Sequence, residues 1–141
     1  MAVNIDEGEP GTFKDRWILE HAPHLLLELM LIAAFALQVR HAFVYIRGEF
    51  DLPYRRLAAA VEEAYDAGLL GEQVMGSGFA CDLVVYRGAG SYVCGEASAL
   101  MGMLIYLPSV GNFDAWQLVT TCNLWCDRPN AHALIKDIET T

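Results

Sequence analysis

Residues 3–16 read Val-Asn-Ile-Asp-Glu-Gly-Glu-Pro-Gly-Thr-Phe-Lys-Asp-Arg, an apolar strand-like start that runs into a loop rich in carboxylates. We call residues 4–12 the acidic loop. It places Asp6, Glu7 and Glu9 among glycines and a proline. Like charges this close repel one another, so each carboxylate needs solvent or a hydrogen-bond donor. Two interpretations stay open: a solvated acidic turn, or a loop that meets ligand donors such as the sugar hydroxyls of a nucleotide.

Composition narrows the class of protein. A chain of 141 residues with 55% hydrophobic and 19% charged residues can fill the core of one domain. The net charge of −9 argues against binding to nucleic acid or to an anionic membrane surface, because both need a basic face. We therefore expect no nucleic-acid partner and no direct membrane contact.

The sequence gives no clear sign of a membrane span, a signal peptide or a disulfide-stabilised fold. The most apolar run, residues 25–39, is interrupted by Glu28 and is shorter than the roughly 20 residues that a bilayer span requires, so we expect a buried helix. No signal peptide is evident at the N-terminus. The four cysteines are too few for a secreted disulfide scaffold, which favours a reducing compartment.

Hydrophobic patterning predicts alternating strands and helices. We expect a strand before the acidic loop, strands over 42–46 and 82–86, and helices over 23–39, 53–67 and from about Gly95, with Gly68 as a helix cap. This alternation implies βαβ units and a parallel sheet. Ligands bind beyond the carboxyl ends of such strands, so the topology could bring the loops that follow two strands to one edge.

The second such loop, residues 87–96, is called here the glycine loop. It carries Gly88, Gly90 and Gly95, and a helix that starts at its end would offer N–H groups to a phosphate or an electron-rich ring. The pattern departs from the dinucleotide fingerprint because Val93 stands at the position of the third glycine. Taken alone, the pattern also fits a plain tight turn.

Several ordered motifs carry a more specific signal: the acidic loop with Lys14-Asp15-Arg16, residues 45–50, residues 76–79 and the glycine loop. Together they resemble the flavin-binding (51 kDa type) subunit of respiratory complex I, the NADH:quinone oxidoreductase. The same module occurs in NAD-linked hydrogenases and formate dehydrogenases. The resemblance implies an α/β fold, a three-layer parallel sheet with helices on both faces, of the Rossmann-like FMN-binding type and incomplete here. It covers residues 1–101, and residues 102–141 form a divergent tail.

The resemblance also implies a site. Matched residue by residue, the flavin contacts lie in both loops and one residue helps to hold NADH: Asn4, Asp6, Glu7 and Gly8 for the flavin, Glu9 for NADH, and Tyr92, Gly95 and Glu96 for the second flavin loop. The implied chemistry is hydride transfer from NADH to FMN, followed by single electrons passing to iron–sulfur clusters and then quinone. We name no catalytic side chain and no metal ligand.

Implied partners are the other subunits of a complex I-type peripheral arm, notably a thioredoxin-like subunit with a 2Fe–2S cluster. The implied location is the cytoplasmic side of the inner membrane, or the matrix side in mitochondria. The 4Fe–4S cluster of the family has no ligands in this chain.

The chain departs from the family at Ala97, where a second glutamate is expected, and throughout the tail. These departures leave open an alternative, a truncated non-enzymatic remnant or assembly module. A zinc module built on Cys122, Cys126 and His132 is a further alternative, but the spacing matches no established pattern. We expect Cys94 to be a buried small residue rather than a redox thiol, and Trp17 to anchor the acidic loop to the core.

Overall fold

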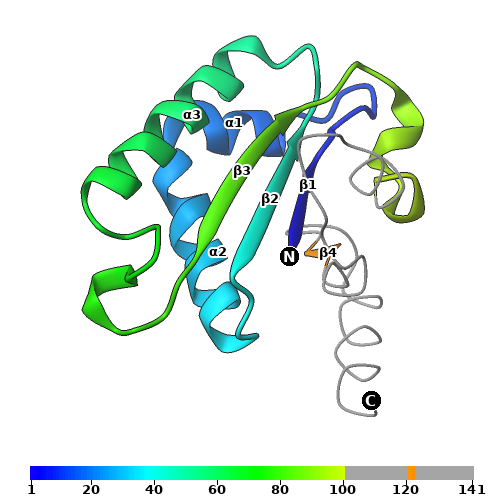
Figure 1. The fold of residues 1–141 in the computed structure, drawn as a ribbon. Helices are drawn as coiled ribbons and strands as arrows, with labels where there is room; N and C mark the ends of the chain where they lie inside the picture. Colours follow the sequence, from blue (N-terminus) through cyan, green and yellow to red (C-terminus); the bar gives the residue numbers. More distant parts are fainter. Residues whose placement is uncertain (101–120, 123–141) are drawn as a thin grey trace.

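A computed structural model describes residues 1–100 and 121–122 of the protein. Its strands and helices, in chain order, are β1 (Ala2–Ile5), α1 (Lys14–His21), α2 (Pro23–Ala36), β2 (His41–Ile46), α3 (Asp51–Asp66), the 3₁₀ turn η1 (Val74–Gly76), β3 (Asp82–Arg87), the 3₁₀ turn η2 (Tyr92–Gly95) and β4 (Thr121–Cys122). The strands form one parallel sheet in the order β3-β2-β1-β4 (Figure 1).

The prediction of an α/β fold with a parallel sheet is confirmed. Helices α1, α2 and α3 lie together on one face of the sheet (Figure 1). A helical layer on the opposite face, the other half of that expectation, falls outside the described residues. The division of the chain near residue 101 also stays a prediction, because residues 101–120 and 123–141 are not described.

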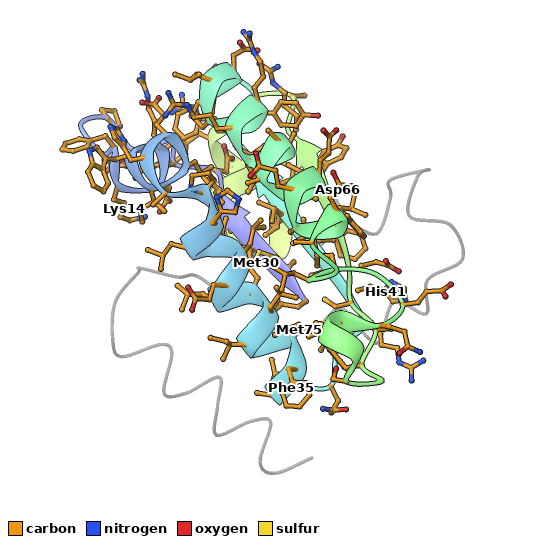
Figure 2. The ribbon with its side chains drawn as sticks, turned by 90° about the vertical axis from the view of Figure 1, so that its left-hand side faces the viewer. Lys14, Met30, Phe35, His41, Asp66 and Met75 are labelled. Carbon is orange, nitrogen blue, oxygen red and sulfur yellow. The ribbon has the colours of Figure 1, made fainter. Side chains whose placement is uncertain are left out.

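Strand alternation builds the core between the sheet and these helices. Val3 and Ile5 of β1, with Val44 and Ile46 of β2, point toward the helices and are almost fully buried. The helices contribute the apolar side chains Leu26, Leu27, Met30, Leu57 and Val61. Figure 2 views this helical layer, with Met30 on α2 and Asp66 at the end of α3.

Helix α2 differs from its prediction in two ways. It begins at Pro23 as expected but ends at Ala36, and Gln38 then adopts a left-handed conformation with φ 55°. It is also not buried all round, because Leu29 and Ile32 are 42% and 59% exposed. The expectation of a fully buried helix is therefore wrong, since the sheet and α3 cover only one side of it.

Helix α1 is absent from the sequence prediction. Its N-cap residue, Phe13, makes no side-chain capping hydrogen bond, so the usual local start signal is missing. The predicted core anchor Trp17 lies on this helix at 54% exposure and stacks on His21, so that prediction is wrong. No single described helix is long and apolar enough to cross a membrane; α1 and α2 reach that length and composition only as a pair bent by 102°.

Candidate functional site

The acidic loop and the glycine loop meet at the carboxyl edge of the sheet. Asn4 Nδ2 donates a hydrogen bond of 2.8 Å to the Gly95 carbonyl oxygen, and Asn4 Oδ1 accepts one of 3.0 Å from the Asp6 backbone N–H. A Cβ on Gly95 would lie 3.0 Å from the Asp6 carbonyl oxygen, so the two backbones are in close contact. The expectation that topology brings these loops together is confirmed.

A second contact joins the loops on their outer side. The Tyr92 hydroxyl donates a 2.6 Å hydrogen bond to Glu9 Oε2. The Tyr92 ring covers Gly8, whose Cβ position would be 3.2 Å from Tyr92 Cδ2. The hydrogen bond to Glu9, with the carboxylate charge, raises the pKa of Tyr92. The ring is 71% exposed, so this contact can be exchanged for another without disturbing the core.

The carboxylate of Glu7 accepts hydrogen bonds from backbone groups of this chain. Its side chain is buried, and its carboxylate accepts hydrogen bonds from the backbone N–H groups of Asp15 (3.2 Å) and Arg16 (3.3 Å), with Lys14 Nζ 3.7 Å away. The carboxylate thus closes the N-terminus of α1, where a negative charge is favoured. The Glu7 carbonyl oxygen also accepts a 2.7 Å hydrogen bond from Arg47 Nη1.

Asp6 is different, because part of its carboxylate is left without a partner. Its Oδ2 atom is buried and has no hydrogen-bond partner among the described residues. Burial raises the pKa of Asp6; the charge of Arg47 lowers it, and that of Glu49 raises it. An orphaned buried acceptor is costly unless something else donates to it. Asp6 therefore has a buried carboxylate oxygen at the loop junction that no described residue satisfies.

Glu96 ends the glycine loop and caps the next helical turn. Its Oε2 accepts hydrogen bonds from the backbone N–H groups of Ser98 (3.0 Å) and Ala99 (3.1 Å), and one from the Ser98 hydroxyl. The hydrogen bonds from Ser98 lower the pKa of Glu96. Residues 92–95 form a 3₁₀ turn and a helical turn occupies residues 97–100, so the helix predicted near Gly95 is present and begins two residues later. The reason is the Glu96 cap, which sets the start one residue after itself.

Tyr45 on β2 is a site residue that the sequence did not reveal. It is 1% exposed, and its hydroxyl oxygen would be 2.4 Å from a Cβ on Gly88. Burial and the neighbouring Cys94 raise the pKa of Tyr45. Cys94 is buried, as predicted. Gly48 is a second missed position, since its Cβ would lie 2.4 Å from the Gly88 carbonyl oxygen. The several glycines of these loops were the available signal, because some of them mark close backbone approach.

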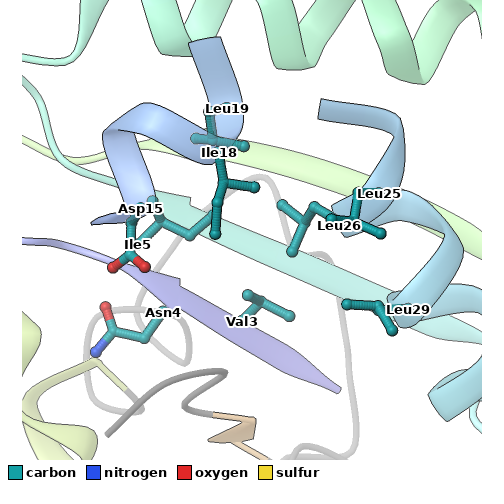
Figure 3. A pocket seen from close by; sticks show the side chains of 9 residues that line it. All are labelled: Val3, Asn4, Ile5, Asp15, Ile18, Leu19, Leu25, Leu26 and Leu29. Atoms are coloured by element: carbon teal, nitrogen blue, oxygen red, sulfur yellow. The ribbon is translucent and has the colours of Figure 1, made fainter. Parts of the chain in front are cut away.

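A cavity of about 150 Å³ lies behind the acidic loop, between β1, α1 and α2 (Figure 3). Apolar side chains line most of it: Val3, Ile5, Ile18, Leu19, Leu25, Leu26 and Leu29. The polar residues Asn4 and Asp15 lie at one end (Figure 3). The cavity is on the helical side of the sheet and involves none of the glycine loop, and it meets the loop junction at Asn4.

The metal alternative receives no support within the described residues, where no group of His, Cys, Asp or Glu side chains could hold a metal ion. Two of its three proposed ligands, Cys126 and His132, lie outside those residues.

All eight residues assigned from sequence lie at this edge of the sheet, but their side chains have different uses. Five of them make the contacts between the loops: Asn4, Gly8, Glu9, Tyr92 and Gly95. The carboxylates of Glu7 and Glu96 accept hydrogen bonds from backbone N–H groups at the start of a helical segment. Asp6 has a buried oxygen with no hydrogen-bond partner among the described residues. The junction can therefore bind a ligand with hydrogen-bond donors that approaches along glycine backbone.

Known proteins share this arrangement. Residues 1–110 match the family described as the Nuo51 FMN-binding domain. The chain is 52% identical over 101 residues to NADH dehydrogenase [ubiquinone] flavoprotein 1, mitochondrial, of Dictyostelium discoideum, covering 72% of this chain and 21% of that protein. It is 53% identical over 104 residues to a subunit of the NADH-quinone oxidoreductase of Mycobacterium bovis, covering 74% of this chain and 23% of that subunit.

Solved structures agree. The NAD⁺-reducing [NiFe]-hydrogenase in its H₂-reduced state superposes with a TM-score of 0.62 at 36% identity, covering 73% of this chain and 17% of that one. The chain thus spans only about a fifth to a quarter of the curated relatives that it matches. The matched region contains both loops and strands β1, β2 and β3 of the sheet, and the chain therefore belongs to the Nuo51 FMN-binding domain family.

Proposed function

We propose that this chain forms part of the FMN-binding wall of an NADH dehydrogenase flavoprotein, with the acidic loop and the glycine loop facing the flavin. The observation that carries the proposal is the loop junction, where Asn4 and Gly95 bring two glycine-containing backbones into contact beside Asp6. The match to an FMN-binding family over residues 1–110 supports it.

The residues present fit a flavin in two respects. Asp6 Oδ2 is a buried acceptor with no described partner, and a flavin carries ribityl hydroxyls and a ring imide N–H that could donate to it. Gly8 and Gly95 let backbone approach a flat ring without a side chain between. Tyr92 is exposed and can move from Glu9 to the edge of a ligand.

FMN, when bound, supplies the redox chemistry, because it accepts a hydride and releases single electrons. The protein's part is to hold, orient and shield. Asn4 joins the two loops through its two hydrogen bonds. Tyr45 is buried and packs against Gly88 of the glycine loop. Asp6 orients a donor on the ligand. No side chain at the junction is required as an acid or a base.

Glu9 is the proposed contact for NADH, and its carboxylate accepts a hydrogen bond from Tyr92 of the second flavin loop. Ala97 stands where the family has a second glutamate, so this chain offers one carboxylate fewer to the nicotinamide. We expect nicotinamide binding to be weaker than flavin binding for this reason.

The assembly is part of the same proposal. The relatives are named as complex I subunits and the structural neighbours as NAD⁺-reducing hydrogenase, both multi-subunit enzymes. We infer that the chain works beside other peripheral-arm subunits, including a 2Fe–2S thioredoxin-like one, on the cytoplasmic or matrix side of a membrane. A formate dehydrogenase remains a further setting, and electrons would leave through iron–sulfur clusters held elsewhere.

The test is a titration of FMN with the purified chain, followed by flavin fluorescence. Saturable quenching is expected, and it should be lost in the variant Gly48→Ala, whose added Cβ would displace the glycine loop at Gly88. Flavin fluorescence that stays unquenched at saturating protein would defeat the proposal for this chain, while family membership would stand.

A non-enzymatic assembly module is the second candidate. It is favoured by the carboxylates of Glu7 and Glu96, which are already used by helix starts, and by Ala97. A cooperative thermal transition of the isolated chain that FMN shifts upward through ligand linkage would count against this candidate.

A further inference from the structure

The turn that follows β2 lies between the two loops of the site. We call residues 47–50 the central turn. Because β2 lies between β1 and β3 and all three strands are parallel, this turn leaves the sheet at the same edge as both loops (Figure 1). A Cβ on Gly48 would lie 2.4 Å from the Gly88 carbonyl oxygen and 3.1 Å from the Gly90 backbone nitrogen. The central turn is therefore packed against the glycine loop.

Arg47 joins the central turn to the acidic loop. Its Nη1 atom donates a 2.7 Å hydrogen bond to the Glu7 carbonyl oxygen, across 40 positions of the sequence. Its Nε atom donates a 3.1 Å hydrogen bond to Glu49 Oε2 within the central turn. The Arg47 backbone N–H donates to the Ile5 carbonyl oxygen at 3.0 Å, where β1 ends and the chain continues into the acidic loop. Backbone and side chain of Arg47 thus hold the same segment.

Arg87 joins the glycine loop to the central turn in a similar way. Its Nε atom donates a 2.8 Å hydrogen bond to the Gly48 carbonyl oxygen. Its Nη1 atom donates a 3.1 Å hydrogen bond to Asp51 Oδ1 at the start of α3. Each of the two arginines therefore bridges one backbone carbonyl and one carboxylate, and together they connect both loops to one turn.

The two guanidinium groups differ from ordinary surface charges. Exposed ion pairs contribute little to stability, and the side chains of Arg47 and Arg87 are 31% and 39% exposed. Each nevertheless donates to a backbone carbonyl of another segment, and such a charge-assisted hydrogen bond is stronger than a neutral one. Phe50 lies under the Arg47 guanidinium at 5.7 Å and Tyr54 under that of Arg87 at 5.5 Å. The ring and the carboxylate keep each planar group in one orientation.

We propose that Arg47 and Arg87 are positioning residues of the flavin site, which fix the acidic loop and the glycine loop to the central turn between them. Neither guanidinium has to touch the flavin, because each acts through a backbone carbonyl. The inference deepens the proposed function and rests on it for the effect on FMN. The fixing of the loops is measured without a ligand.

The test is amide hydrogen exchange of Arg47→Met and Arg87→Met in the full chain without flavin. Arg47→Met should speed exchange in residues 6–12 roughly fivefold, the effect of losing one hydrogen bond, and leave residues 88–94 close to the parent. Arg87→Met should do the reverse. The amides of α2 are the internal reference, because this helix makes neither contact.

Matched variants separate the guanidinium fork from its charge. Arg16→Met is the control, since Arg16 pairs with Glu20 within α1 at 2.7 Å and its loss should leave both loops unchanged. Arg47→Lys and Arg87→Lys keep the charge, but one ammonium cannot reproduce the fork that joins a carbonyl to a carboxylate. The lysine variants should therefore loosen the same loops as the methionine variants.

The outcomes separate this inference from the proposed function. Faster exchange of each loop in its own variant supports the positioning roles. Equal increases in both loops, an increase that extends to α2, or full protection in the lysine variants would overturn them. Where FMN binds the parent, its affinity should fall roughly fivefold in each methionine variant and stay unchanged in Arg16→Met, and an unchanged affinity in all three would also overturn them. Failure of FMN to bind the parent counts against the proposed function alone.

Discussion

Asn4 Nδ2 donates to the carbonyl oxygen of Gly95 at 2.8 Å, across 91 positions of the sequence. The same amide accepts from the Asp6 N–H, so one side chain ties the end of β1 to the end of the glycine loop. The amide of Asn4 is thus engaged by protein groups at both ends. Its effect on a ligand would come in large part from where it places Asp6 and Gly95.

Replacing Asn4 with alanine should destabilise the chain by about 1–2 kcal/mol, because the Gly95 carbonyl and the Asp6 N–H both lose a partner. The change is measured as the free energy of unfolding in urea. Thr12→Val is the control, since the Thr12 hydroxyl donates to the Glu9 carbonyl in an exposed position and its loss should cost under about 0.5 kcal/mol. Equal losses of stability in the two variants would show that the hydrogen bonds of Asn4 do not hold the two loops together.

Gly48→Ala should be severe and Gly8→Ala mild. The added Cβ at Gly48 meets the Gly88 carbonyl oxygen at 2.4 Å, and backbone cannot yield easily, so we expect a loss of about 2–3 kcal/mol. At Gly8 the nearest atom belongs to the exposed Tyr92 ring, which can rotate away. Thermal unfolding of the two variants checks this order, and a milder effect at Gly48 would contradict the close approach of the two segments.

The pKa of Asp6 predicts a pH dependence. Burial raises it above its ordinary value of 3.8, so the folded state holds this proton more tightly than the unfolded state does. The contribution of Asp6 to stability is therefore full below about pH 3.8 and is lost as pH rises through the higher folded-state pKa. Asp6→Asn should remove this loss and be more stable than the parent at neutral pH.

Urea midpoints of Asp6→Asn and the parent, taken from pH 3 to 7, measure the difference. Glu62→Gln is the control, because Glu62 is exposed on α3. The advantage of Asp6→Asn should grow with pH above 3.8. An advantage that does not change with pH would mean that the orphaned Oδ2 atom is not the cause.

Gln38→Gly should stabilise the protein, by about 0.5–1 kcal/mol. Gln38 has φ 55°, a left-handed conformation that costs energy for a residue with a Cβ and none for glycine. The same substitution two residues earlier, Ala36→Gly, should destabilise by a similar amount because Ala36 is helical. Urea unfolding of the two variants should give changes in stability of opposite sign. A loss of stability in both variants would contradict a strained backbone at Gln38.

Much of the fold was predictable, because its signals are local. The strand pattern of residues 42–46 and 82–86 and the cap at Gly68, which has φ +68°, were all found where expected. Helix α1 was missed because its N-terminus is closed by Glu7, a residue well before it in the sequence. No local pattern indicates a cap of that kind.

The candidate site was predictable in place but not in the function of each side chain. Topology and family motifs located the two loops. Nothing in the sequence distinguishes Glu7, whose carboxylate caps α1, from Asp6, whose Oδ2 atom has no hydrogen-bond partner among the described residues. Tyr45 looked like an ordinary strand residue, since its close contact with Gly88 depends on a position that comes more than 40 residues later. Such pairings are set by tertiary contacts.

The claim that both loops form one flavin site is tested most directly by amide hydrogen exchange of the chain with and without FMN. Residues 6–12 and 91–96 should gain protection together, at the same FMN concentration, while the amides of α3 stay unchanged. Protection of one loop alone, or of neither at saturating FMN, would contradict a shared site at the junction of Asn4 and Gly95.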